Sequence, residues 1–348
     1  MVKTVRLGVI GAGSIFEDRH FPALTEMDGV EVVAIANRTT ESARTSSEKF
    51  DLDAEALDSP ETVISRADVD AVMIGTWPYK HHEYTLAALE AGKHVFVQAR
   101  MARSLAEAKE MYARSEETDL VTQICPSPLG MRGDKKVQTL IDEGFLGELR
   151  FARANVTGGQ RADPDDPIHW RDIERYQGIN ALAVGILVER LHRWVGQARS
   201  VSARARTHIA ERPSAEGDGT ETVDLPDLVS IHCSLQNGAV GSFDFSTVIP
   251  HSPTNLIELY GSDGTIRYDL DDDTLSTGTP NGELSKEEIT EETAVEWTVE
   301  EDFVDAVRHG GSPRTTFQEG VRYMEFSEAV FRSVESGGRV HLPLRTSG

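Results

Sequence analysis

A short apolar run that ends in closely spaced glycines restricts the fold of this chain more than any other feature. Residues 5–10 read VRLGVI, and GAGSIF over 11–16 follows at once and opens a helical pattern. A strand that passes through Gly-x-Gly into a helix presents unpaired backbone N–H groups to a phosphate. Gly11 permits the tight turn and Gly13 lets the backbone approach a pyrophosphate, so the segment predicts a dinucleotide site.

The first helical turn of this segment departs from the usual pattern. Ser14 and Ile15 begin the helix and belong to the predicted cofactor contacts, but Phe16 occupies the third position of the motif, where Gly or Ala is usual. We therefore expect looser packing between helix and strand at Phe16, or a shifted helix.

Further apolar runs alternate with helical patterns up to residue 125. The runs lie at 31–37, 70–76, 93–99 and 120–125, and Gly92 closes one of the intervening helices. Strands that alternate with helices at this spacing predict an α/β Rossmann domain with a doubly wound parallel sheet over residues 1–125.

The pattern changes at Pro126, which predicts a second domain over residues 126–348. Polar and apolar residues there partly alternate, as in an antiparallel sheet with one covered face, so we expect an α+β domain. Asn237-Gly238 between two such runs predicts a hairpin. Segments 211–224 and 271–288 are rich in Gly, Pro, Ser and acidic residues and are predicted to be exposed loops.

Charge and cysteine content exclude several functions. The formal net charge of −23 disfavours nucleic acid and anionic membrane surfaces, and its even spread fits a salt-adapted, halophilic surface. Cys125 and Cys233 lie far apart without metal-ligand spacing, so we expect no metal site and two reduced thiols. The N-terminus runs straight into a strand and no long apolar segment occurs, which favours a cytoplasmic protein.

The end of the second run bears on the type of dinucleotide. Asn37 stands about 20 residues after the glycines, where an acidic residue would bind the ribose 2′-hydroxyl of NAD, and Arg38 follows. A neutral side chain beside a guanidinium suits a 2′-phosphate, so we favour NADP over NAD. Stacking of Arg38 on the adenine of either cofactor is the alternative.

Together these motifs resemble the glucose-fructose oxidoreductase, inositol dehydrogenase and rhizopine-catabolism family (Gfo/Idh/MocA). The similarity rests on GVIGAGSI with RHFPAL, GTWPYKHHEYTLAALEAGKHVFV, LIDEGFLGELRFARA, LQNGAVGSF, LIELYGSDGTIRYD and EDFVDAVRHGG in this order. The resemblance implies a Rossmann domain, a second domain with a large open antiparallel sheet that often forms homodimers or homotetramers, and hydride transfer at the nicotinamide to or from a carbohydrate-like substrate. It places Thr76, Trp77 and His82 near the dinucleotide.

The chain departs from the family pattern where the chemistry is expected. The usual Glu-Lys-Pro corresponds to Gln98, Ala99 and Arg100, so the family's lysine is absent. The usual Asp and His of the second-domain helix correspond to Ala183 and Leu187, which cannot exchange a proton. The family's standard mechanism therefore does not transfer.

Residues near the same crevice are the candidates to replace these groups. We expect a general acid/base among His169, Tyr176, Tyr79 and Lys80. A capping or surface role for His169 and an exposed position for Lys80 are the alternatives. The remaining predicted contacts are Gln98 for the nicotinamide ribose, and Arg100, Trp170, Arg171, Asn180 and Arg190 for the substrate.

Three functions remain open on this basis. The first is an NAD(P)-dependent oxidoreductase that acts on a sugar, sugar acid or polyol. The second is a redox-neutral, lyase-like enzyme that uses the cofactor transiently. The third is a non-catalytic sensor that binds NAD(P) or a carbohydrate.

Overall fold

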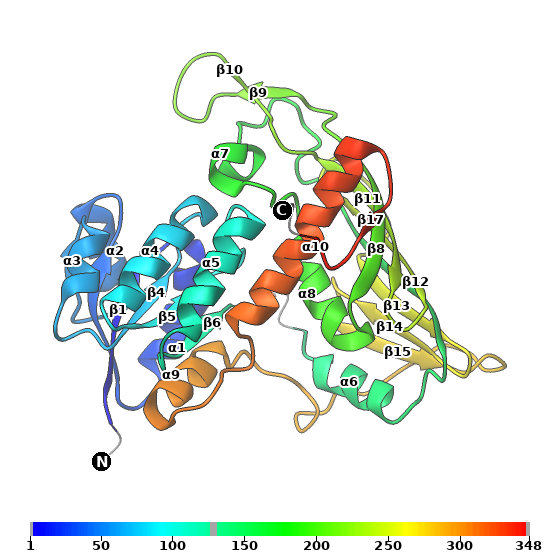
Figure 1. Ribbon diagram of the computed structural model, residues 1–348, viewed down its shortest axis with the longest axis horizontal. Helices are drawn as coiled ribbons and strands as arrows, with labels where there is room; N and C mark the ends of the chain where they lie inside the picture. Colours follow the sequence, from blue (N-terminus) through cyan, green and yellow to red (C-terminus); the bar gives the residue numbers. More distant parts are fainter. Residues whose placement is uncertain (1–2, 126–130, 346–348) are drawn as a thin grey trace. The chain divides into compact units, whose positions relative to one another are not determined.

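The computed structural model of this chain describes residues 3–125 and 131–345 and divides into two compact units (Figure 1). The first unit comprises Met1–Pro126 and Thr298–Met324, and the second comprises Ser127–Trp297 and Glu325–Gly348. The prediction of one boundary at residue 126 therefore missed that residues 298–324 belong to the first unit.

The return of 298–324 has a clear physical basis. The backbone N–H of Ile124 donates to the Thr315 carbonyl over 3.2 Å, and the Thr315 hydroxyl donates back to the Ile124 carbonyl. These bonds occupy backbone groups at the outer strand of the first sheet, which would otherwise stay unpaired. A boundary inferred from composition cannot detect such a late segment.

The first unit contains a parallel sheet of six strands in the order β3-β2-β1-β4-β5-β6. The order reverses direction beside β1, which is the switch point of a doubly wound sheet, and this confirms the predicted Rossmann architecture. Its strands are β1 Val5–Ile10, β2 Val30–Ala36, β3 Glu55–Leu57, β4 Ala71–Ile74, β5 His94–Val97 and β6 Thr122–Ile124.

Helices join these strands and begin at recognisable caps. The side chains of Thr39, Ser59 and Ser104 each accept a hydrogen bond from a backbone N–H in the first turn of the following helix. The helices of this unit are η1 Phe16–His20, α1 Phe21–Thr25, α2 Thr40–Lys49, α3 Pro60–Ser65, α4 Pro78–Glu90, α5 Leu105–Glu116, α9 Val299–His309 and the first part of α10 Phe317–Ser336.

The second unit contains a nine-stranded sheet in the order β16-β15-β14-β13-β7-β12-β11-β8-β17. All neighbours pair antiparallel except β7 with β12, so the predicted mostly antiparallel sheet is confirmed. Its strands are β7 Leu149–Thr157, β8 Ala198–Arg206, β11 Leu228–Leu235, β12 Val240–Ser246, β13 Leu256–Gly261, β14 Thr265–Asp269, β15 Thr274–Gly278, β16 Ser285–Lys286 and β17 Val340–His341.

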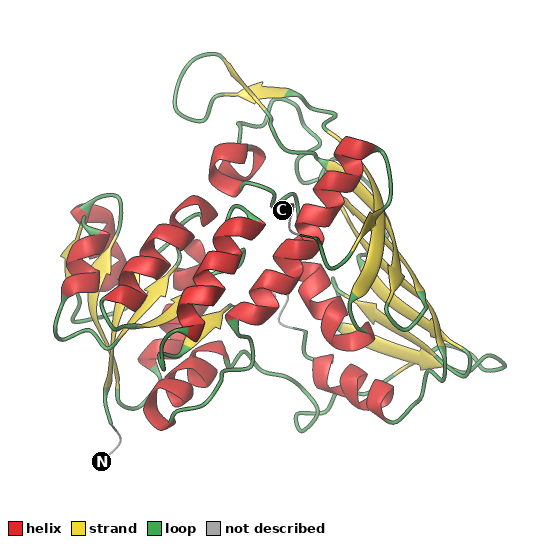
Figure 2. Cartoon of the chain, in the orientation of Figure 1, coloured by secondary structure: helices red, strands yellow, loops and turns green. Residues whose placement is uncertain are grey.

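Helices cover one face of this sheet, as Figure 2 shows for the second unit. Alternate residues of β11 are buried, and Ile231 packs in one cluster with Leu187 and Leu191 of α8. Burial of such side chains contributes about 1.5–3 kcal/mol each and holds helix and sheet together. The helices of this unit are α6 Asp134–Asp142, η2 Trp170–Asp172, α7 Glu174–Gln177, α8 Val184–Val195 and the rest of α10.

Two predicted loops contain strands, and the predicted hairpin is confirmed. Asn237-Gly238 connects β11 to β12, with Gly238 at φ 93°. Segment 211–224 forms the ribbon of β9 Glu211–Pro213 and β10 Thr220–Thr222, and 271–288 holds β15 and β16. The loop prediction was wrong because each segment has a single buried apolar residue, Val223 in 211–224 and Leu275 in 271–288, which is too little for a strand pattern.

Over residues 3–125 and 131–345, no helix has both the length and the apolar character needed to cross a membrane. The same residues hold no cluster of three or more His, Cys, Asp or Glu side chains suited to a metal ion.

Candidate functional site

The glycine turn after β1 forms as its sequence requires. Gly11 has φ +83°, and a Cβ there would lie 2.7 Å from the backbone nitrogen of Thr76, so the position demands glycine. A Cβ at Gly13 would meet nothing within 4 Å, which leaves open space over the start of the helix. A phosphate can approach the backbone at Gly13 and meet the N–H groups of the first turn.

Phe16 shifts the helix, and Gly75 makes room for it. Residues Phe16–His20 form a π-helical turn, in agreement with the expected shift. The Phe16 ring is buried, and a Cβ at Gly75 would overlap that ring and lie 2.7 Å from the carbonyl oxygen of Gly11. The glycine usually found in the helix is thus replaced by a glycine at the end of the neighbouring strand.

A pocket of about 400 Å³ opens at the carboxyl ends of these strands in the first unit. Ligands of open α/β sheets bind at this edge, beside the switch point. Its lining includes Gly11, Gly13, Asn37, Arg38, Thr76 and Trp77 from the predicted cofactor set, together with Tyr79 and Lys80. Ser14 and Ile15 form the helical turn beyond Gly13 and are not part of the lining.

Asn37 and Arg38 face this pocket in different ways. The backbone N–H of Ala12 donates to Asn37 Oδ1 over 2.8 Å, so Asn37 fastens the glycine turn and keeps its amide hydrogens for other acceptors. The Arg38 guanidinium lies 5.9 Å from the centre of the Trp77 ring. The pocket therefore presents an exposed cation where β2 ends.

The Thr76 hydroxyl supports the fit of a dinucleotide to this pocket. It is buried and has no hydrogen-bond partner among the described residues. A buried hydroxyl without a partner is costly, and a bound polar ligand would relieve that cost. Together with the open space at Gly13, this donor set suits a phosphate and ribose.

Tyr79 and Lys80 lie in the first turn of α4, on the wall of the same pocket. The Lys80 ammonium pairs with Glu83 over 2.7 Å, and this hydrogen bond raises the pKa of Lys80. A raised pKa keeps the amine protonated, which opposes the predicted role as a base. Lys80 instead adds a second cation to the wall that holds Arg38.

His82 lies outside the pocket, in contrast to the position that the family resemblance implied. Its Nε2 lies 2.9 Å from the Glu110 carboxylate on α5. Successive helical residues point about 100° apart, so the neighbouring His81 turns inward instead. His81 is buried, with its two ring nitrogens each 2.8 Å from a carbonyl oxygen, of Thr76 and of Arg100.

Gln98 and Arg100 follow β5 and are buried, outside the lining of this pocket. The Gln98 amide nitrogen contacts Nε2 of His20, and Nδ1 of His20 contacts the Glu300 carboxylate. This order is consistent with an amide that donates to Nε2 and an imidazole that donates through Nδ1–H. Sequence reasoning missed the His20–Glu300 contact because 280 residues separate the partners.

His169 in the second unit caps η2 and has a defined tautomer. The Arg171 backbone N–H donates to His169 Nδ1 over 3.2 Å, so a neutral His169 carries its proton on Nε2. Burial, and then the charge of Arg171, lowers the pKa of His169. His169 thus caps η2 through Nδ1 and offers a hydrogen-bond donor at Nε2.

The aromatic residues of this segment carry stacked arginines. The Arg171 guanidinium lies 4.3 Å from the centre of the Trp170 ring, and that of Arg175 lies 4.6 Å from the Tyr176 ring. One face of Trp170 is therefore covered by Arg171, which opposes the prediction of an open platform for a sugar ring.

Asn180 and Arg190 are both buried and engaged within the second unit. The Asn180 amide donates to the Gln177 carbonyl over 2.6 Å, and the Arg190 guanidinium pairs with Asp134 of α6. The ion pair with Asp134 occupies the Arg190 guanidinium and argues against its predicted projection into a substrate pocket. Leu187, one turn earlier on the same stripe, is fully buried in the core, so this stripe faces the protein interior.

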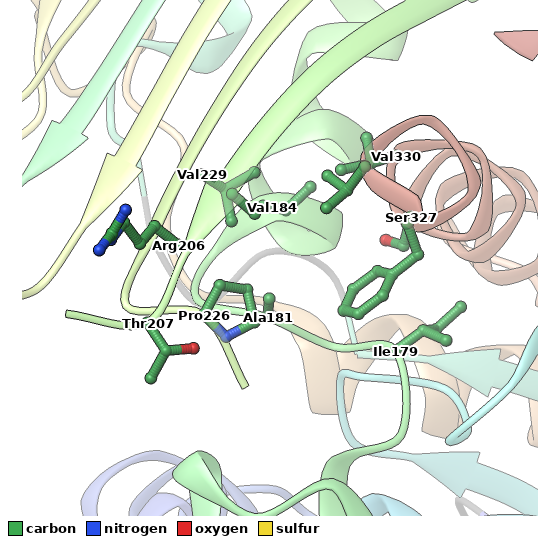
Figure 3. Close-up of a pocket in the computed structure, with 12 residues that line it drawn as sticks. Ile179, Ala181, Val184, Arg206, Thr207, Pro226, Val229, Ser327 and Val330 are labelled. Atoms are coloured by element: carbon green, nitrogen blue, oxygen red, sulfur yellow. The ribbon is translucent and has the colours of Figure 1, made fainter. Parts of the chain in front are cut away.

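An apolar pocket of about 210 Å³ in the second unit was not predicted (Figure 3). Ala181 and Val184 at the start of α8 meet Val229 of β11 and Val330 of α10, while the Arg206 side chain extends away from them. No residue in its lining is a candidate acid or base. Four segments far apart in the chain form this pocket, so no local pattern could reveal it.

The comparison with known proteins now identifies the family. Residues 5–124 match the model "Oxidoreductase family, NAD-binding Rossmann fold", and residues 135–267 match the model "GFO/IDH/MocA C-terminal domain". The chain belongs to the Gfo/Idh/MocA family. The two family models match the two halves of this Gfo/Idh/MocA oxidoreductase in the order that its motifs predicted.

Two curated relatives illustrate the similarity. Inositol 2-dehydrogenase 3 of Saccharopolyspora erythraea is 26% identical over 349 residues, which cover 98% of this chain and 96% of the relative. Levoglucosan dehydrogenase of Pseudarthrobacter phenanthrenivorans is 29% identical over 226 residues, 60% of this chain and 58% of the relative.

Solved structures show the same fold. Apo levoglucosan dehydrogenase matches with a TM-score of 0.88 and 22% identity, over 99% of this chain and all of the other. An oxidoreductase domain protein from Kribbella flavida matches with a TM-score of 0.90 and the same identity and coverage.

Proposed function

We propose that this protein is an NADP-preferring oxidoreductase that transfers a hydride between the nicotinamide and a sugar, sugar acid or polyol. The observation that carries the proposal is the pocket beside Gly13, where an open approach to the helix N-terminus meets the unpartnered hydroxyl of Thr76. Relatives named for inositol and levoglucosan support the carbohydrate class, and one neighbour was solved with NADH and levoglucosan.

The preference for NADP rests on charge at the adenosine side of the pocket. Arg38 and Lys80 both line it, and Asn37 replaces the carboxylate that would repel a 2′-phosphate. Asp58 also lines the pocket, and its carboxylate would repel a 2′-phosphate, so we expect a preference for NADP and not exclusion of NAD.

The nicotinamide, when bound, accepts or supplies the hydride. The chain's own contribution is to hold the substrate oxygen and move its proton. His169 Nε2–H is suited to donate to that oxygen, and the Tyr176 phenol on the same segment is our candidate to carry the proton. The ion pair of Lys80 with Glu83 argues against Lys80 as the base.

The second candidate is a non-catalytic NAD(P)-dependent carbohydrate sensor. Ala183 and Leu187 favour it, because neither of them exchanges protons and Leu187 is part of the core. A redox-neutral reaction stays open as well, because it needs the same cofactor and proton carrier.

A turnover screen separates these functions. The full chain in molar-range KCl is incubated with NADP⁺ and a panel of aldoses, sugar acids and polyols, and NADPH formation and sugar products are both followed. Substrate-dependent NADPH supports the oxidoreductase, and a changed sugar without NADPH supports the redox-neutral enzyme. Binding without either change supports the sensor.

Variants then test the assigned roles. We expect Tyr176→Phe to lower kcat about 100-fold or more, the usual effect of losing a proton carrier. His169→Gln should lower kcat less, because an amide still donates a hydrogen bond. His82→Gln is the matched control, since His82 lies outside the pocket, and an equal loss in this variant would contradict the assignment.

A further inference from the structure

Arg171 is an arginine whose charge no carboxylate of the described residues neutralises. Its guanidinium rests on the Trp170 ring at 4.3 Å, and no described Asp or Glu forms an ion pair with it. Although the side chain is exposed, removal of water by the surrounding protein lowers the pKa of Arg171, and no acidic group offsets that effect.

Arg171 lacks an ion pair among the described residues although acidic residues crowd the same segment. The chain carries 58 Asp and Glu against 35 Lys and Arg, and Asp163, Asp165, Asp166 and Asp172 lie within ten residues of Arg171.

The acid next to Arg171 is committed elsewhere. Asp172 pairs with Arg161 over 2.8 Å and accepts the backbone N–H of His169 over 2.9 Å. Arg212 approaches the same carboxylate to 4.0 Å. The Asp172 carboxylate thus serves Arg161 and Arg212, and it forms no ion pair with Arg171.

The stacking on Trp170 defines how Arg171 meets a ligand. A guanidinium held over an indole ring loses little side-chain freedom when a ligand binds to its N–H groups. That edge matches the two oxygens of a carboxylate through two parallel hydrogen bonds. His169 Nε2–H adds a neutral donor one residue from Trp170.

We propose that Arg171, held on Trp170, is a carboxylate receptor and that the substrate is therefore a sugar acid, such as a uronic acid. This inference rests on the proposed function and narrows its substrate class. A monoanion fits better than a phosphate dianion, because the protein carries a net charge of −23 and repels a dianion more strongly.

The test compares an acid with its isosteric neutral amide. Binding of D-glucuronate and D-glucuronamide to the full chain with NADP⁺ is measured by tryptophan fluorescence at fixed KCl concentration. We expect wild-type protein to prefer D-glucuronate by about ten-fold or more in Kd, the usual gain from a charge-assisted pair of hydrogen bonds.

Variants locate the receptor. Arg171→Met should reduce the preference to about two-fold or less and leave D-glucuronamide affinity nearly unchanged, and Arg171→Lys should retain only part of it. Arg175→Met is the matched control, because Arg175 is a stacked arginine on the same segment, and it should keep the full preference.

The outcomes separate this inference from the proposed function. Absence of an acid preference, absence of D-glucuronate binding, or loss of the preference in Arg175→Met alone would overturn the carboxylate receptor. Tighter binding of D-glucose 6-phosphate than of D-glucuronate would overturn it as well. NADPH formation from neutral polyols without acid preference would support the oxidoreductase and refute the carboxylate receptor. Acid preference without any turnover would support the receptor and refute the oxidoreductase.

Discussion

Replacement of Gly13 by alanine tests the cofactor site without disturbing the fold. A Cβ at Gly13 meets no protein atom within 4 Å, and this glycine is not among those with positive φ. The substitution should therefore change the free energy of unfolding by no more than about 1 kcal/mol. Any change should be stabilising, because alanine lowers the conformational entropy of the unfolded chain.

The same methyl group would occupy the space through which a pyrophosphate approaches the helix. Loss of one charge-assisted hydrogen bond costs about 1.5–3 kcal/mol, so Kd for NADPH should rise about 10- to 150-fold. Cofactor fluorescence measures Kd, and urea unfolding without cofactor measures stability.

Gly217 provides the control for this variant. It also has open space around its Cβ position but lies in an exposed segment of the second unit, so Gly217→Ala should leave both quantities unchanged. The reasoning is refuted if Gly13→Ala binds NADPH as tightly as the wild type, or if it loses affinity only because it unfolds.

Three further predictions concern the first unit. Gly75→Ala should lower the free energy of unfolding by about 1–3 kcal/mol, because the new Cβ overlaps the Phe16 ring. Phe16→Ala in the same chain should recover part of that loss. Additive effects of the two substitutions in urea unfolding would contradict this packing. Glu300→Leu should cost about 1–3 kcal/mol in thermal or urea unfolding because it removes the acceptor of His20 Nδ1, and Glu300→Gln should cost less; equal losses would refute this. Burial lowers the pKa of His94, so the unfolded chain binds a proton that folded His94 does not, and stability should fall as the pH drops below about 6.5; an equally steep fall between about pH 7.5 and 5.5 in His94→Asn would exclude this cause.

The sequence predicted those parts of the protein that local patterns encode. The glycine turn at Gly11, the alternating strands and helices and the Asn237-Gly238 hairpin each depend on a few adjacent residues, and all appear in the structure. Phe16 in a glycine position indicated looser packing or a shifted helix, and the structure forms a π-helical turn there.

Other features depend on partners that are distant in the chain. Helical spacing placed Arg190 toward a ligand, but its partner Asp134 lies much earlier in the chain, on another helix. The pairing of His20 with Glu300 spans nearly the whole chain. The return of residues 298–324 to the first unit rests on the bonds between Thr315 and Ile124. None of these contacts leaves a periodic signal in the sequence.

The candidate acid and base residues illustrate an intermediate case. The sequence indicated His169 and Lys80 as groups able to exchange protons, which their chemistry allows. Their state depends on neighbours: the Arg171 backbone N–H occupies His169 Nδ1, and Glu83 holds Lys80 protonated. Composition shows which groups are present, and only geometry shows which proton each one can donate.

A crystal structure of the full chain with bound NADP⁺ tests the central claim most directly. We expect the pyrophosphate against the backbone at Gly13, a hydrogen bond from the Thr76 hydroxyl to the cofactor, and the 2′-phosphate within reach of the Arg38 guanidinium. A dinucleotide bound away from Gly13, or a 2′-phosphate that contacts neither Arg38 nor Lys80, would contradict it.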